Sequence, residues 1–140
     1  GLKSPADCLS YSAAVRSLER IADHASEIAI KSSLIGTVPE ELRKRIVKMS
    51  DLSLQLLSDA IEAFLRKDYY LADSIVDKSE NIRSIEDDII ALIDKDKNPR
   101  NYNNIYVKLI LDHIRRTAEY SFDIAEAAMN QIVGEVIEIR

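Results

Sequence analysis

Three acidic residues in the N-terminal part of the chain, Glu19, Asp23 and Glu27, follow one another at intervals of four. Residues four apart share one face of an α-helix, so their carboxylates can converge on a hard cation, which prefers oxygen ligands. A second acidic pair with the same spacing, Glu119 and Asp123, lies near the C-terminal end. These five residues are a candidate metal site.

The alternative interpretation of the first three acids is a solvated charged face. Arg16, Arg20 and Lys31 lie close enough along the helix to brace them. Charged residues on a helix surface usually have this role and contribute little to stability. The sequence leaves both interpretations open.

The two acidic stretches belong to an internal similarity. A shift of 96 residues aligns apolar and charged positions of the first segment with those of the last. The aligned pairs are Arg20 and Arg116, Asp23 and Glu119, Glu27 and Asp123, Ile28 and Ile124. Glu19, however, aligns with Arg115, which repels a cation. The pattern indicates an internal repeat whose second copy is the poorer metal site.

Other site chemistries lack their residues. His24 and His113 are the two histidines, and neither follows a glutamate by three positions, which excludes the ferritin-like di-iron motif. The chain has three glycines and no glycine-rich phosphate loop or nucleophile elbow. Cys8 is the single cysteine, and we expect it to be a small buried residue on a helix face. The sequence therefore predicts no enzyme.

Composition narrows the class of protein and its partners. The 140 residues are 46% apolar and 31% charged, with a net charge of −5, which fits one helical domain over 1–140. An acidic chain is a poor ligand for nucleic acid. No apolar run approaches the ~18 residues that span a bilayer. With one cysteine and no signal peptide at its start, we expect the chain to lie in the cytoplasm and not to cross a membrane.

Four helices must position these residues. The 3.6-residue apolar period predicts helices over residues 5–33, 38–67, 69–94 and 102–133. The polar stretch 94–101 contains Asn-Pro and is the clearest loop. Short connections make consecutive helices antiparallel neighbours, so the predicted fold is all-α, an antiparallel up-down-up-down four-helix bundle.

Each helix has a stripe of apolar or small residues that we expect to be buried. In the first helix the stripe comprises Cys8, Tyr11, Val15, Leu18, Ala22, Ala25 and Ala29, and Ile21 and Ile28 widen it. In the second it comprises Leu42, Ile46, Met49, Ser53, Leu56, Ala60 and Ala63. In the third it comprises Leu71, Ile75, Lys78, Ile82, Ile85, Ile89 and Leu92, with the Lys78 ammonium reaching water. In the fourth it comprises Val107, Leu111, Ile114, Ala118, Ser121, Ala125, Ala128 and Ile132. An aspartate at position 18 is then expected to be severely destabilising.

Local signals mark the helix ends. Ser4 before Pro5 is an expected N-cap, and Asp68 is another. Thr37 and Glu40 have the spacing of a capping box that starts the second helix. Gly134 is expected to end the fourth helix.

The segment Leu18-Glu-Arg-Ile-Ala-Asp-His-Ala-Ser-Glu-Ile-Ala29 resembles the L-E-R-I-G-D-x-A-x-x-I-A signature that closes each three-helix repeat of PhoU proteins. Ala22 replaces the usual glycine, which a helix tolerates well. The stretch 71–86 is similar to another part of the repeat. The resemblance implies that the last three helices form one whole repeat, that the first helix closes a preceding one, and that the chain is a C-terminal fragment.

The resemblance also implies a function. PhoU proteins are cytoplasmic negative regulators that link phosphate transporters to the phosphate response, and some bind metal clusters through E/D-x-x-x-D motifs. We therefore expect a protein partner, either the ATPase of a phosphate transporter or a sensor or regulator, together with self-association. The implied ions are Fe, Mn or Mg, although no cofactor is certain. A metal-binding carboxylate bundle and a bare oligomerisation module are the alternatives.

Overall fold

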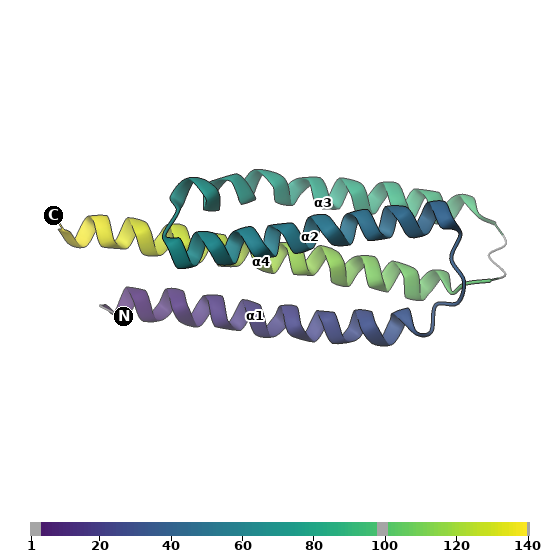
Figure 1. Cartoon of the computed structure of the whole chain (residues 1–140), viewed down its shortest axis with the longest axis horizontal. Coiled ribbons are helices and arrows are strands. Elements are labelled where there is room, and N and C mark those ends of the chain that lie inside the picture. The colour runs from purple at the N-terminus through teal and green to yellow at the C-terminus, as the bar shows by residue number, and fades with distance from the viewer. Residues whose placement is uncertain (1–3, 98–100, 140) are drawn as a thin grey trace.

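The computed structural model describes residues 4–97 and 101–139. Its four helices are α1 (Pro5–Ser32), α2 (Glu40–Arg66), α3 (Tyr69–Lys95) and α4 (Asn104–Ile139). They lie alongside one another with alternating direction (Figure 1), which confirms the all-α, up-down-up-down antiparallel architecture. Residues 98–100 of the expected loop lie outside the described residues. No helix in the described part of the chain is long and apolar enough to cross a membrane.

The fourth helix is the centre of the packing. It contacts the other three helices, and α2 also packs against α3. Within the described residues, the backbone of α1 approaches α4 closely but neither α2 nor α3. The rings of Tyr11 and Phe64 still meet edge to face between α1 and α2, with their centroids 5.0 Å apart. The expectation that consecutive helices are packed neighbours is therefore wrong for the backbones of α1 and α2, which approach each other in the described residues through side chains such as Tyr11 and Phe64.

The core of α2, α3 and α4 is apolar. The stripes predicted in α2 and α4 are buried, with Ile46 and Ile132 only partly so. In α3 the buried stripe runs through Ala72, Ile75, Ile82, Ile89 and Ile93, and Lys78 is exposed as expected. The buried Ser53 Oγ donates a 3.0 Å hydrogen bond to the carbonyl oxygen of Ile114, so this polar atom has a partner.

The stripe predicted in α1 is wrong, although Ile21, which was expected to widen it, is buried, and Ile28 is partly buried. The buried residues of α1 are Asp7, Ser10, Ala14, Ser17, Ile21 and His24. Each lies one residue before its predicted counterpart, which is a rotation of about 100° around the helix. The predicted residues Cys8, Val15 and Leu18 are exposed instead. A single neighbouring helix can cover only one narrow face, and α4 covers the face with small and polar residues.

Two predicted N-caps are confirmed. Ser4 Oγ accepts a 3.2 Å hydrogen bond from the Asp7 backbone N–H at the start of α1. Asp68 Oδ1 accepts one of 3.0 Å from the Leu71 backbone N–H at the start of α3. A third cap, Asn103, was not predicted; its Oδ1 accepts a hydrogen bond from the Tyr106 backbone N–H at 3.0 Å.

The predicted capping box is absent from the structure. Pro39 occupies the N-cap of α2 without a side-chain hydrogen bond, and Glu40 pairs with Arg43. The Thr37 backbone N–H donates to the Asn101 carbonyl oxygen at 2.8 Å, and Gly36 and Tyr102 form an isolated β-bridge. Thr37 is therefore held by the neighbouring connection, which removes it from the helix start.

The predicted end of the fourth helix is also wrong, because α4 continues through Gly134 to Ile139. Glycine costs only about 1 kcal/mol inside a helix, so contacts with other helices can outweigh its preference for a helix end. One such interaction is an ion pair between Lys67, at the end of α2, and Glu135.

Candidate functional site

The three acids of α1 lie on its outer side. Glu19 and Asp23 are exposed, and Glu27 is partly buried. Lys31 Nζ donates to Glu27 Oε2 at 2.5 Å, and this hydrogen bond holds the pKa of Glu27 below its ordinary value. Glu27 is therefore paired with a cation, as expected for a solvated charged face. Glu19 and Asp23 have the spacing and exposure that binding of one metal ion by both carboxylates would need.

The two acids of α4 meet arginines. Glu119 Oε1 accepts hydrogen bonds of 2.8 Å from Arg83 on α3 and from Arg115 on α4. Asp123 is exposed, although partial burial and then the charges of Glu126 and Glu119 raise its pKa. Glu119, Asp123, Glu80, Arg83 and Phe122 line a hollow of about 150 Å³. In the described residues no three His, Cys, Asp or Glu side chains lie close enough to hold one metal ion.

Arg115 is the centre of a partly buried ion network between α3 and α4. Its guanidinium contacts both carboxylate oxygens of Glu86 at 3.2 Å and also pairs with Asp112 and Glu119. Burial raises the pKa of Glu86 more than Arg115 lowers it. Burial lowers the pKa of Arg115, but its carboxylate partners outweigh this effect and raise it. The Arg115 guanidinium therefore compensates the negative charges of Glu86, Asp112 and Glu119.

The structure brings together two histidines that the sequence did not connect. His24 Nδ1 on α1 and His113 Nδ1 on α4 are 2.8 Å apart, a hydrogen bond in which one nitrogen donates and the other accepts. Tyr120 stacks on the His24 ring at a centroid distance of 5.7 Å. The signal was present in the sequence, because His24 continues the stripe of Ser10, Ala14, Ser17 and Ile21. The contact was not predicted, because apolar spacing favours the neighbouring stripe.

This histidine pair predicts a pH dependence of stability. Burial is the main cause that lowers the pKa of both imidazoles below 6.5. The second cause is the charge of His113 in the case of His24, and the charge of Lys31 in the case of His113. Asp23 and Glu27 on α1 and Asp112 and Arg116 on α4 also act on the pair. A lowered folded-state pKa favours the folded state above pH 6.5, and this stabilisation is lost as the pH falls through the folded values.

Urea unfolding of the wild type at pH 8, 7, 6 and 5 is therefore expected to show a loss of stability below about pH 6.5. A variant with both His24→Gln and His113→Gln can keep a hydrogen bond but cannot titrate, so its loss over the same range is expected to be smaller. Equal slopes for the two proteins would show that the pair does not contribute.

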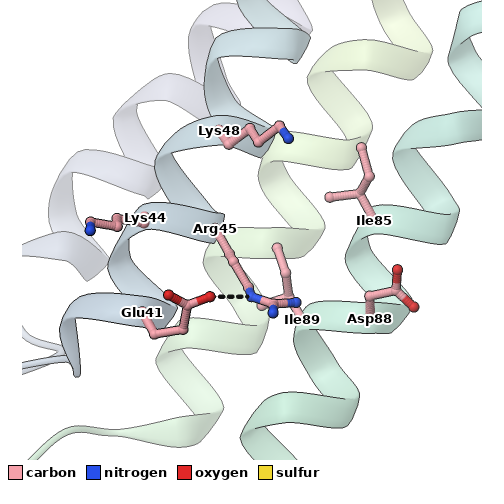
Figure 2. A pocket seen from close by; sticks show the side chains of 7 residues that line it. All are labelled: Glu41, Lys44, Arg45, Lys48, Ile85, Asp88 and Ile89. Atoms are coloured by element: carbon pink, nitrogen blue, oxygen red, sulfur yellow. Dashed lines mark hydrogen bonds and ion pairs between the residues drawn. The ribbon is translucent and has the colours of Figure 1, made fainter.

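A groove lies between α2 and α3, where no functional residue was predicted from the sequence. One hollow of about 410 Å³ is lined by Glu41, Lys44, Arg45, Lys48, Ile85, Asp88 and Ile89. Figure 2 shows Arg45 and Lys48 reaching from α2 toward α3, with Arg45 Nε bonded to Glu41 Oε1 at 3.0 Å. A second hollow of about 380 Å³ shares Ile85 and is also lined by Leu52, Gln55, Leu56, Asp59, Lys78, Asn81, Ile82 and Ser84. Together the two hollows form the α2–α3 groove.

Comparison with known proteins decides the family. The family model described as the PhoU domain matches residues 46–128, which is more than half of the chain. The chain belongs to the PhoU family. The match covers all of α3 and most of α2 and α4, so the PhoU unit coincides with the three helices that share the apolar core. The Leu18–Ala29 segment that carried the resemblance precedes the matched region.

Two curated PhoU relatives extend the similarity over almost the whole chain. They are proteins of two Streptococcus pneumoniae strains, each named a phosphate-specific transport system accessory protein PhoU homolog. Each is 29% identical over an alignment of 140 residues, and the alignment includes 94% of this chain and 62% of the relative. The chain thus spans about three-fifths of the length of these relatives. No solved structure matches the chain.

Proposed function

We propose that this chain is a cytoplasmic regulator of phosphate uptake or phosphate signalling that acts through protein–protein contacts and not as an enzyme. The observation that carries the proposal is the PhoU-family match, supported by relatives named accessory proteins of a phosphate-specific transport system. An accessory protein needs a surface more than a catalytic centre. The exposed apolar side chains of Tyr11, Val15 and Leu18 on α1 are typical of a surface that contacts other proteins.

The proposed partner is the ATPase of a phosphate transporter or a phosphate sensor or regulator. Calorimetric titration of the purified chain with each of these soluble domains is expected to show saturable binding to at least one. The ATPase domain of a transporter for another substrate is the control. Equal binding to the control, or binding to none by a chain whose circular dichroism is helical, would contradict the proposal. Light scattering of the chain alone tests the proposed self-association.

A metal-dependent role is the second candidate, and the exposed Glu19 and Asp23 favour it. Their carboxylates share one face of α1 and are not part of the core. They supply two oxygen ligands, whereas Arg83 and Arg115 engage Glu119 on α4. The donor set therefore fits a hard cation such as Mg²⁺ or Mn²⁺, which is often held by one or two carboxylates and keeps several waters.

Replacing both Glu19 and Asp23 with alanine is expected to change stability by less than about 1 kcal/mol, because exposed charges contribute little. Titration of Fe(III), Mn(II) and Mg(II) by calorimetry at neutral pH is expected to show weaker binding to this variant than to the wild type. Binding should also weaken as the pH falls, because protons compete with the cation for the carboxylate oxygens.

The double replacement of Asp73 and Asp77 with alanine is the matched control, because these two aspartates are also exposed and four apart, on α3. Identical weak isotherms for the wild type and the Glu19/Asp23 variant would rule out the site. Equal losses in the two variants would indicate nonspecific attraction to surface charge.

A further inference from the structure

The α2–α3 groove is open because of the way in which α1 packs. In the described residues the backbone of α1 lies against α4 and does not approach α2 or α3. The outer side of the α2 and α3 pair therefore has no covering helix among the described residues. Two packed helices leave a furrow between them, and a third helix is the element that fits such a furrow.

The groove has an apolar floor. Leu52, Leu56, Ile82, Ile85 and Ile89 line it, and Leu52 is 40% exposed although it is a large apolar residue. Along α2 the lining runs from Glu41 to Asp59, which corresponds to about 27 Å at 1.5 Å per residue. The length matches five turns of a docked helix of about 18 residues.

The rim of the groove is more basic than the chain as a whole. Four cations line the two hollows, namely Lys44, Arg45, Lys48 and Lys78, against the three carboxylates of Glu41, Asp59 and Asp88. The chain overall carries a net charge of −5. Among the described residues no carboxylate lies within ion-pair distance of Lys48 or Lys78, whereas Arg45 pairs with Glu41. These two lysines are positioned to meet negative charge on a bound partner.

We infer that the α2–α3 groove docks an acidic amphipathic helix of a partner protein. The partner helix lays an apolar stripe on the floor and places Glu or Asp side chains beside Lys48 and Lys78. The inference rests on the proposed function in that it takes the partner to be a protein, and it adds the chemistry of the segment that is recognised.

The probe is a synthetic helical peptide of 18 residues with leucines at helical spacing and glutamates at the flanking positions. A matched peptide has lysines in place of the glutamates. Fluorescence anisotropy with the full chain is expected to show that the acidic peptide binds at least tenfold more tightly than the basic one. Its affinity should fall as salt is raised, because part of the attraction is electrostatic.

Leu52→Glu and Lys48→Glu are each expected to weaken binding of the acidic peptide at least tenfold. Leu54→Glu is the matched control, because Leu54 lies on the same helix, is 56% exposed and does not line the groove. Lys95→Glu, an exposed position at the end of α3, controls for net charge. Circular dichroism of each variant shows whether the helices are retained.

Three results would overturn the inference: no binding of the acidic peptide, equal binding of the two peptides, or equal effects of the groove and control variants. The oligomeric mass of the protein without peptide is measured as well. If Leu52→Glu changed this mass and left the peptide affinity unchanged, the groove would be assigned to a second copy of the chain, which would also overturn the inference. The peptide contains no transporter or sensor sequence. Its failure to bind therefore leaves the proposed regulatory role standing, and failure of those domains to bind leaves the groove standing.

Discussion

Ile21→Asp is expected to destabilise the docking of α1 by about 3 kcal/mol or more, because an unpaired carboxylate would be buried. Ile21 is 8% exposed in the stripe that α1 presents to α4. Leu18→Asp is the matched comparison, since Leu18 is 40% exposed one turn away, and its cost is expected to stay within about 1 kcal/mol. Urea unfolding followed by circular dichroism measures both values.

The comparison of Ile21→Asp with Leu18→Asp distinguishes the observed packing of α1 from the packing predicted from its apolar spacing. If the stripe predicted from apolar spacing were buried, Leu18→Asp would be the more damaging change. The expected order follows from the observed stripe, in which the bulky apolar residues of α1 remain at the surface. A larger loss for Leu18→Asp than for Ile21→Asp would contradict the observed register of α1 on α4.

Gly36→Ala is expected to cost about 2–4 kcal/mol, through left-handed backbone strain together with the loss of one or two hydrogen bonds. Gly36 has φ +84°, and a Cβ built there would lie 2.4 Å from the Asn101 carbonyl oxygen. That oxygen accepts the Thr37 backbone N–H, and Asn103 N–H donates to the Ile35 carbonyl oxygen, both at 2.8 Å. Moving Asn101 would strain the contact between the α1–α2 and α3–α4 connections.

The same substitution at Gly134 provides the control. Gly134 lies inside α4, and a Cβ there would meet nothing within 4 Å. Alanine is the better helix former, so Gly134→Ala is expected to stabilise the chain by up to about 1 kcal/mol. Thermal unfolding of the two variants should move the midpoint in opposite directions. A midpoint lowered by Gly134→Ala would contradict the continuation of α4 past this residue.

Much of the fold could be predicted from the sequence, because several local patterns in it were strong. The stripes of α2 and α4 were correct because these helices lie in an apolar core whose members must be apolar or small, such as Met49 and Leu111. Ser4 and Asp68 were correct as caps because a short polar side chain before a helix satisfies a backbone N–H of its own first turn. The Leu18–Ala29 segment indicated the PhoU family, which the comparison then confirmed.

The predictions that failed depended on distant neighbours. Thr37 and Glu40 have the spacing of a capping box, but the backbone of Thr37 is bonded to Asn101, 64 residues further along the chain. The stripe of α1 was misplaced because two adjacent faces of that helix both alternate by three and four. Hydrophobicity favoured the face of Val15 and Leu18, whereas α4 covers the face of Ser17 and Ile21. Local sequence patterns do not show which face of a helix is covered by a neighbouring helix of the same chain.

Four amphipathic helices, their alternating direction and the spacing of Glu19, Asp23 and Glu27 can be predicted without the structure, because these features arise from residues at most a few turns apart. The packing of the helices explains why His24 meets His113, why Arg115 meets Glu86 and why α2 and α3 leave an open groove. Each of these features joins residues on different helices. Their contact depends on the rotation and relative position of whole helices, which are set by packing around α4 and not by local periodicity.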